Sequence, residues 1–283
     1  MALCVRSPGA VCIRVCEKKR YHCASAAILA DLWRPCAVDR SQRMPLAADI
    51  VKSGAMRLLG SARRPAPSLF SLPGLEARAD WRGAKGLEAA GFRPLADAVR
   101  RIEDATDALA DEYVEAKAAR AEAGRKASDY EADASLHGGR WDWLSYVDRG
   151  AIKPSFAREA PVAARLLDAV PRLMTGVPFG HAFYSALGAG AEIKPHTAPM
   201  NLRLRVHVPL AVPEGDVGMR LAGEELKWRR GEALVFDDSF VHETWNRTAA
   251  DRVVLLFDVW HPGLGDDEVG AVVEMFRRAA KPK

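Results

Sequence analysis

The chain has 283 residues, of which 49% are hydrophobic, enough for one sizeable globular core or for a core with an appendage. The formal net charge of +4 is unevenly distributed, since residues 1–64 hold twelve Lys and Arg against four Asp and Glu. The rest of the chain is therefore slightly acidic and lacks the basic surface that a nucleic-acid-binding protein needs.

Residues 1–70 are predicted to form a basic, Cys- and Arg-rich extension, either disordered or translated from an upstream start site. All five cysteines lie in it, at Cys4, Cys12, Cys16, Cys23 and Cys36. Their odd number argues against a disulfide framework, and their spacing does not complete a set of zinc ligands. A body without cysteine suits a reducing compartment, so we predict a cytoplasmic protein, with an organellar transit peptide as the alternative. No apolar stretch is long enough to span a membrane.

The folded domain is predicted over residues 71–283, with helices that support a sheet. Apolar residues recur at steps of three and four from Pro94 to about Ala123, which indicates an amphipathic helix. A second helix is predicted over Ala160–Leu173. A last helix, from Asp266 to about Ala280, is expected to cover a sheet edge.

The rest of the domain is predicted to be β-structure. A turn at Gly138 leads into a strand that ends near Val147. After Gly180, short strands separated by Gly, Pro and Asn follow: His181–Leu187, Asn201–Leu210, Gly218–Leu221, Glu225–Trp228, Ala233–Phe236 and Arg252–Trp260. Short strands at this spacing favour a sandwich or barrel over a parallel α/β sheet. The fold class is therefore mostly β with supporting helices (α+β).

One predicted strand, Asn201–Leu210, alternates apolar and polar side chains. Its polar face carries Arg203, Arg205 and His207. If this face is buried, the two guanidinium groups need anionic partners, and the face is suited to binding carboxylates. The alternative is a solvated face of an antiparallel sheet.

His196 and His242 are the candidate metal ligands. Imidazole suits iron, and a mononuclear oxygenase site needs positions left open for substrate and O2. Many such sites place an aspartate two residues after the first histidine, where this chain has Ala198. Asp238 is either a direct ligand or an acid outside the ligand set that holds a metal-bound water, and we favour the second role.

Arg252 opens an almost continuously apolar strand, so its guanidinium group needs an anionic partner. One alternative is a structural ion pair with Asp251 or Asp258. The other is the distal carboxylate of a 2-oxoglutarate co-substrate, which would also accept a hydrogen bond from the Ser185 hydroxyl.

Three motifs together resemble the aspartyl/asparaginyl β-hydroxylase family: His196-Thr-Ala-Pro-Met-Asn-Leu-Arg-Leu-Arg-Val-His207, Phe236-Asp-Asp-Ser-Phe-Val-His-Glu-Thr-Trp245, and Arg252 followed by Asp258-Val-Trp-His-Pro262. The resemblance is strong from Ser185 to Pro262 and weaker back to Leu72. It implies a double-stranded β-helix core, of the jelly-roll or cupin type, with amphipathic helices on its N-terminal side. It also implies Fe(II), O2 and 2-oxoglutarate as the co-substrate.

The resemblance assigns roles to individual residues. It matches His196 and His242 to the iron ligands and Asp238 to an acid that holds an iron-bound water. It matches Ser185 and Arg252 to the far carboxylate of 2-oxoglutarate. The other matches are Arg205 and His207 near the metal-binding end of the co-substrate, Trp141 as a further contact to it, and Arg203 as a contact to a substrate carboxylate. The family has glycine where this chain has Ala198 and likewise lacks the carboxylate ligand.

The function predicted on this basis is hydroxylation of a carbon in an acidic substrate. The substrate is expected to be an Asp or Asn side chain in a peptide or protein, or a small amino-acid derivative. One alternative is a non-catalytic β-helix module that binds an acidic ligand or a protein partner. A lesser alternative is an iron halogenase, because alanine at position 198 would leave a coordination site for a halide.

Overall fold

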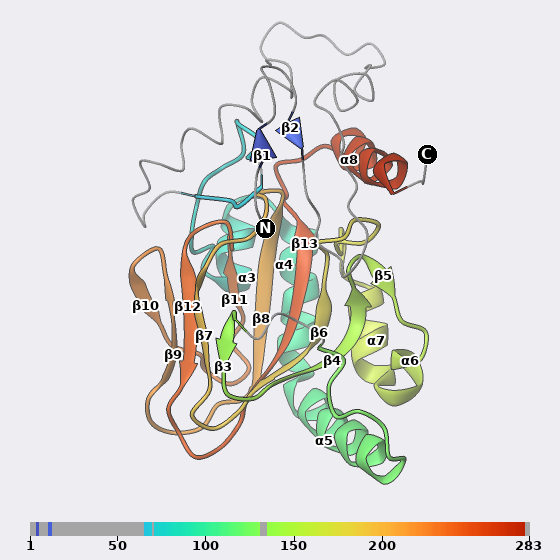
Figure 1. Ribbon diagram of the computed structural model, residues 1–283, viewed down its shortest axis with the longest axis vertical. Coiled ribbons are helices and arrows are strands. Elements are labelled where there is room, and N and C mark those ends of the chain that lie inside the picture. Colours follow the sequence, from blue (N-terminus) through green and yellow to red (C-terminus); the bar gives the residue numbers. More distant parts are fainter. Residues whose placement is uncertain (1–3, 6–10, 13–64, 70, 131–134, 281–283) are drawn as a thin grey trace, which may run out of the picture.

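The computed structural model describes residues 4–5, 11–12, 65–69, 71–130 and 135–280 (Figure 1). Most of residues 1–64 therefore lie outside the described part, and so do the predictions made for the cysteines and the basic extension. Within that segment only two short strands are described, β1 (Cys4–Val5) and β2 (Val11–Cys12), which pair antiparallel with each other.

Two antiparallel sheets form the body of the protein. The larger sheet has the strand order β11-β8-β13-β6-β4-β5 and the smaller one β10-β9-β12-β7-β3. The strands are β3 (His137–Gly138), β4 (Trp141–Asp148), β5 (Ala151–Ile152), β6 (Ala182–Leu187), β7 (Glu192–His196), β8 (Arg203–Ala211), β9 (Val217–Leu221), β10 (Glu224–Leu226), β11 (Leu234–Phe236), β12 (His242–Asn246) and β13 (Arg252–Trp260). Neighbouring strands in each sheet are mostly distant in sequence, as in a jelly roll. This confirms the predicted double-stranded β-helix.

The inner faces of the two sheets pack against each other through one apolar cluster. It contains Phe183 and Leu256 from the larger sheet and Met219 and Leu221 from the smaller one. The outer face of the larger sheet packs on helices instead, through a second cluster that includes Tyr184 and residues of β8 and β13. The larger sheet is thus buried on both faces, so side chains on its inner face lie between the two sheets.

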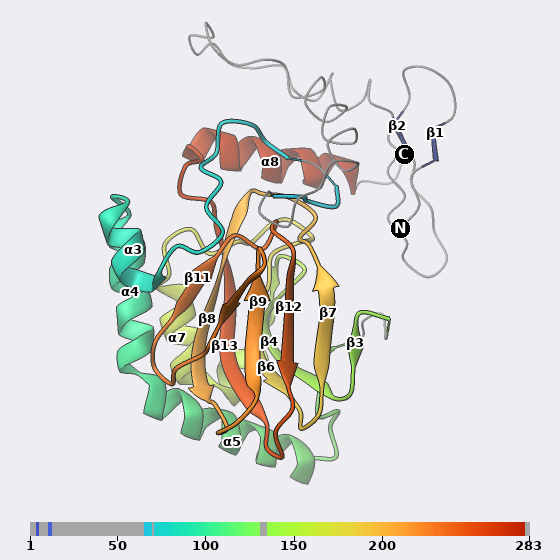
Figure 2. The same ribbon diagram turned by 90° about the vertical axis from the view of Figure 1, so that its left-hand side faces the viewer.

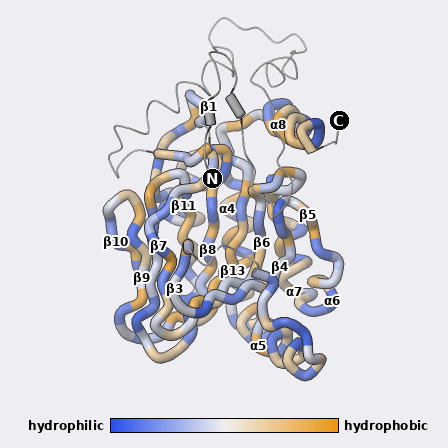
Figure 3. Tube along the Cα trace, viewed as in Figure 1, coloured by the Kyte–Doolittle hydropathy of each residue, from blue (hydrophilic) through white to orange (hydrophobic). Residues whose placement is uncertain are grey.

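The helices are α3 (Gly83–Ala89), α4 (Arg93–Asp104), α5 (Thr106–Glu122), α6 (Phe156–Glu159), α7 (Pro161–Asp168) and α8 (Asp266–Ala279). Figure 2 shows α4 standing beside the sheets, α5 crossing one end of them and α8 lying at the opposite end. Figure 3 shows α5 and α8 carrying both hydrophilic and hydrophobic residues. Among the residues described, no helix combines the length and the apolar character needed to cross a bilayer.

The predicted helix from Pro94 to Ala123 is two helices, α4 and α5, that meet at Ala105. At the junction, the Thr106 hydroxyl donates to the carbonyl oxygen of Glu103, and the Glu103 carboxylate accepts from the backbone N–H of Ala233 at 2.7 Å. The chain turns there because α4 packs beside the sheets while α5 crosses their end. That turn depends on contacts with a distant strand, so the apolar periodicity does not show it.

The predicted strands after Gly180 coincide with β6, β8, β9, β10, β11 and β13 to within two residues at each end. Strands β7 and β12, which carry the two candidate metal ligands, and helix α3 were not predicted. Strand β7 contains Pro195, which has no backbone N–H for a ladder, and its outer face is solvent-exposed. Neither strand has the apolar run that marks β13.

Candidate functional site

Strand β8 places three polar side chains between the sheets. Its apolar residues Leu204, Val206 and Val208 belong to the cluster that packs on the helices. Alternation directs the others to the inner face: Arg203, Arg205 and His207. Arg203 and His207 are 4% and 5% exposed, which excludes the solvated face that was the alternative.

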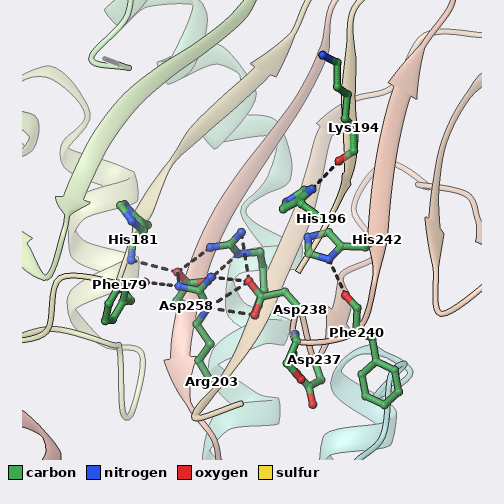
Figure 4. Close-up of polar contacts among 12 residues, drawn as sticks. Phe179, His181, Lys194, His196, Arg203, Asp237, Asp238, Phe240, His242 and Asp258 are labelled. Carbon is green, nitrogen blue, oxygen red and sulfur yellow. Dashed lines mark hydrogen bonds and ion pairs between the residues drawn. The ribbon is translucent and has the colours of Figure 1, made fainter. Parts of the chain in front are cut away.

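His196 and His242 lie opposite each other on paired strands of the smaller sheet. His196 on β7 and His242 on β12 are register partners of each other, and their ring centroids are 4.1 Å apart. Nδ1 of His196 lies 2.7 Å from the carbonyl oxygen of Lys194, and Nδ1 of His242 lies 2.9 Å from that of Phe240 (Figure 4). A carbonyl only accepts, so each Nδ1 carries the proton. Both Nε2 atoms are therefore left with a lone pair for a metal ion.

Both imidazoles are held neutral. Burial, with the charge of His196 as the next cause, lowers the pKa of His242 to about 3. Burial also lowers the pKa of His196. Only the neutral ring binds a metal ion, so both rings are in the metal-binding form at neutral pH.

A cluster of four charged side chains lies beside the histidines: Arg203, Arg205, Asp238 and Asp258 (Figure 4). All but Arg205 are buried. Arg203 donates to Asp238 from Nη2 at 2.5 Å and to Asp258 from Nη1 at 3.1 Å. Arg205 donates to both oxygens of Asp258, at 2.8 and 2.9 Å, and its Nη1 lies 3.3 Å from Asp238. The cluster is electrically balanced, because two carboxylates face two guanidinium groups.

Both guanidinium groups of this cluster contact Asp238. Burial alone would raise its pKa, but the charges of Arg203 and Arg205 outweigh burial and hold the pKa below its usual range. Both carboxylate oxygens accept hydrogen bonds from Arg203. In the part of the chain that is described, no three His, Cys, Asp or Glu side chains converge as metal ligands. This geometry favours a role for Asp238 outside the ligand set.

Arg252 is buried at the start of β13, 1% exposed, without a carboxylate partner among the described residues. The two acids considered for it are engaged elsewhere, Asp251 with Arg140 and Lys117 and Asp258 with the arginines of β8. Burial lowers its pKa to about 9. Its guanidinium group lies over Trp228, 4.6 Å from the ring centroid, and Nε has no hydrogen-bond partner. Such a group is suited to binding an anion from solution.

The remaining predicted residues, Trp141, Ser185 and His207, lie on strands β4, β6 and β8 of the larger sheet. Trp141 donates from Nε1 to the Ser185 hydroxyl at 2.9 Å, and the carbonyl oxygen of Ser185 accepts from Arg252 at 3.4 Å. Neither ring nitrogen of His207 has a partner among the described residues. Burial, followed by the charge of Arg252, holds the pKa of His207 well below its usual value.

The model of the aspartyl/asparaginyl beta-hydroxylase family matches residues 99–262, more than half of the chain and all of the site described above. The chain belongs to this family.

Curated members of the family are similar to it over part of their length. Human aspartyl/asparaginyl beta-hydroxylase is 36% identical over 126 residues, which cover 44% of this chain and 16% of that protein. Human aspartate beta-hydroxylase domain-containing protein 2 is 34% identical over 145 residues, 50% of this chain and 39% of that one. A solved prolyl-4-hydroxylase from Pseudomonas putida, 18% identical, covers 57% of this chain and 88% of that chain with a TM-score of 0.35.

For this β-hydroxylase family member, the sequence did not predict two contacts with the candidate site residues. Asp258 was considered only as a partner of Arg252, although it is the register partner of Arg205 and lies on the same face. Trp228 was placed at a strand end, whereas its ring packs against Arg252. Alternation along β13 was the signal for Asp258, but apolar residues on both faces of that strand obscure the pattern.

Proposed function

We propose that this chain is an Fe(II)- and 2-oxoglutarate-dependent dioxygenase that hydroxylates a carbon of an acidic substrate. One observation carries the proposal. Two neighbouring imidazoles, with ring centroids 4.1 Å apart, are neutral and protonated on Nδ1, which leaves both Nε2 lone pairs for a metal ion. The only buried arginine of the inner face without a carboxylate partner, among the described residues, lies farther along the same sandwich. Together they suit a metal ion and a dicarboxylate.

The residues present fit an iron ion with two protein ligands. His196 and His242 would hold it, and the methyl group of Ala198 offers no donor, so the other coordination positions stay open to small molecules. Bound iron would supply the redox chemistry by which O2 is divided between 2-oxoglutarate and the substrate. Asp238, kept anionic by its two arginines, would accept a hydrogen bond from a water molecule next to the iron.

The protein side chains would position the co-substrate. Arg252 and Ser185 would bind the far carboxylate of 2-oxoglutarate, which neutralises the unpaired guanidinium group. His207 and Arg205 would contact the end nearer the histidines, and Trp141 would orient the Ser185 hydroxyl. The apolar walls of the sandwich exclude water from the reacting atoms.

The substrate class follows from Arg203 and from the family. We propose an Asp or Asn side chain in a peptide or protein, or a small amino-acid derivative, with Arg203 binding its acidic group. The donors of Arg203 are already engaged with Asp238, with Asp258 and with the carbonyl oxygen of Phe179. A substrate carboxylate would therefore have to replace one of these acceptors. The cytoplasmic location stays a prediction.

The test is succinate formation from 2-oxoglutarate by the full chain with Fe(II), ascorbate and O2, with and without Asp- and Asn-containing peptides. We expect turnover by the unsubstituted protein and none by His242→Ala, which lacks one of two ligands. The mass of the product distinguishes hydroxylation from halogenation. Neither turnover nor binding of 2-oxoglutarate by the unsubstituted protein would favour the non-catalytic module.

A further inference from the structure

Thr244 is a buried residue on the inner face of β12, two positions after His242. Its register partners, Met219 on β9 and Ile193 on β7, are both apolar and buried. Alternation puts Thr244 on the same face as His242, toward the larger sheet. It is 5% exposed, and its hydroxyl has no hydrogen-bond partner among the described residues.

The next inward residue of β12 shows where this face leads. Asn246 donates to the carbonyl oxygen of Leu187 at 2.9 Å, and Leu187 is the register partner of Arg252. The inner face of β12 therefore runs from the histidine pair, past Thr244, to the end of the sandwich where Arg252 lies. Thr244 stands between the candidate metal ligands and the candidate anion-binding arginine.

Several other buried polar atoms near Arg252 and His207 also lack hydrogen-bond partners among the described residues. Nε of Arg252, Nε1 of Trp228 and both ring nitrogens of His207 are buried without partners in the part of the chain described. A hydroxyl buried beside Met219 and Ile193 is unfavourable unless something accepts a hydrogen bond from it. A carboxylate bound by Arg252 would accept from the hydroxyl as well.

We infer that the Thr244 hydroxyl donates a hydrogen bond to the distal carboxylate of 2-oxoglutarate, the group that Arg252 binds. This inference rests on the proposed function and adds a binding residue from the smaller sheet. The co-substrate is then held from both sheets, by Arg252 and Ser185 on one side and by Thr244 on the other. A valine at this position would have nearly the same shape and no donor.

The experiment is calorimetric titration of 2-oxoglutarate into the full chain loaded with Mn(II), which replaces Fe(II) and avoids oxidation. We expect Thr244→Val to weaken binding roughly tenfold, the loss of one hydrogen bond to a charged group. Thr244→Ser, which keeps the hydroxyl, should bind nearly as well as the unsubstituted protein. The ligand-free melting temperature of Thr244→Val should be equal or higher, because the variant loses only an unpartnered hydroxyl.

A second ligand, 2-oxobutyrate, has the keto-acid end but no distal carboxylate. Its affinity should be the same for the Thr244→Val variant and the unsubstituted protein. Equal affinities of the two proteins for 2-oxoglutarate would overturn the inference, and an equal loss for both ligands would overturn the contact with the distal carboxylate. No binding of 2-oxoglutarate by the unsubstituted protein would overturn the proposed function itself, and the inference with it.

Discussion

At the scale of single residues, the three arginines on the inner face of the sandwich differ in whether they have carboxylate partners. Arg203 and Arg205 are neutralised by Asp238 and Asp258, whereas Arg252 has no carboxylate partner among the described residues. A buried charge without a partner destabilises the folded state, so a protein keeps one where a ligand will neutralise it. This difference supports the proposal that Arg252 binds the anionic co-substrate.

Replacing Arg252 by methionine should therefore have opposite effects on stability and on binding. Loss of the unpaired guanidinium group should raise the free energy of unfolding of the ligand-free protein by about 1–3 kcal/mol. The same change should abolish the rise in melting temperature that 2-oxoglutarate causes. Urea unfolding and thermal melts with and without 2-oxoglutarate check both effects. Undiminished stabilisation of the variant by 2-oxoglutarate would contradict the assignment.

Asp237 gives a pH-dependent prediction. Burial raises the pKa of its carboxyl group to about 7, while the group accepts a hydrogen bond from Ser239. The unfolded chain has an Asp pKa near ~3.9, so between about pH 4 and pH 7 the folded state holds a proton that the unfolded state has lost. This group therefore makes the free energy of unfolding fall as pH rises through that window.

Asp237→Asn keeps the acceptor and removes the ionisation. We expect it to raise the free energy of unfolding more at pH 8.5 than at pH 5.0, by about 1–3 kcal/mol. Urea unfolding of both proteins at the two pH values measures the difference. The same increment at both pH values would show that the carboxyl group does not titrate in this range.

At the scale of elements, a segment that precedes the sheets secures the loops beside the histidines. Ser68 and Leu69 donate from their backbone N–H groups to the carbonyl oxygens of Ala198 and Pro199, both at 2.8 Å. The Asn201 side chain accepts from the N–H of Leu72 at 2.7 Å and donates to its carbonyl oxygen at 2.9 Å. Residues on the N-terminal side of the predicted boundary at residue 71 thus contact the site, and the boundary itself stays a prediction.

Asn201→Ala should release this segment from the site loops. Two hydrogen bonds in a partly buried position are lost, so we expect the free energy of unfolding to fall by about 1–3 kcal/mol. Amide hydrogen exchange should become faster around Leu72 and Ala198. Ser68→Ala is the matched control, because the bond made by Ser68 comes from its backbone. Unchanged exchange in Asn201→Ala would show that the segment is held by other contacts.

At the scale of the whole molecule, one buried carboxylate joins the helical layer to the larger sheet. Glu112 of α5 accepts from the N–H groups of Val162 and Ala163 in the first turn of α7, at 2.6 and 2.9 Å. It also accepts from the hydroxyl of Tyr184 on β6 at 2.8 Å. A carboxylate at a helix N-terminus is favourable, and here it also ties α7 and β6 to α5.

Glu112→Leu should destabilise the whole domain, because it leaves three buried donors unsatisfied. We expect a loss of about 2–4 kcal/mol in the free energy of unfolding. Glu112→Gln keeps an acceptor oxygen and should lose less. Urea unfolding of both variants provides the measurement. A Gln variant as unstable as the Leu variant would show that packing volume, and not hydrogen bonding, makes the connection.

Local periodicity determined a large part of this protein from its sequence. The alternation of apolar and polar residues predicted that Arg203, Arg205 and His207 share one face of a strand. The structure has that strand as β8, and the other strands predicted after Gly180 are present as well. This succeeds because the direction of a side chain depends on its own strand. The motifs around His196 and His242 also predicted the family, which the family model confirms.

Only the tertiary structure decided which groups meet. The pairing of Asp258 with the arginines of β8, the position of Thr244 and the turn between α4 and α5 at Ala105 depend on strand register and on packing between layers. Partners distant in sequence are set by the closure of two sheets, which no local pattern encodes. The sequence by itself therefore determined the kinds of side chain at the site. The closed sandwich decided that Arg203 and Arg205 are neutralised and that Arg252 has no carboxylate partner among the described residues.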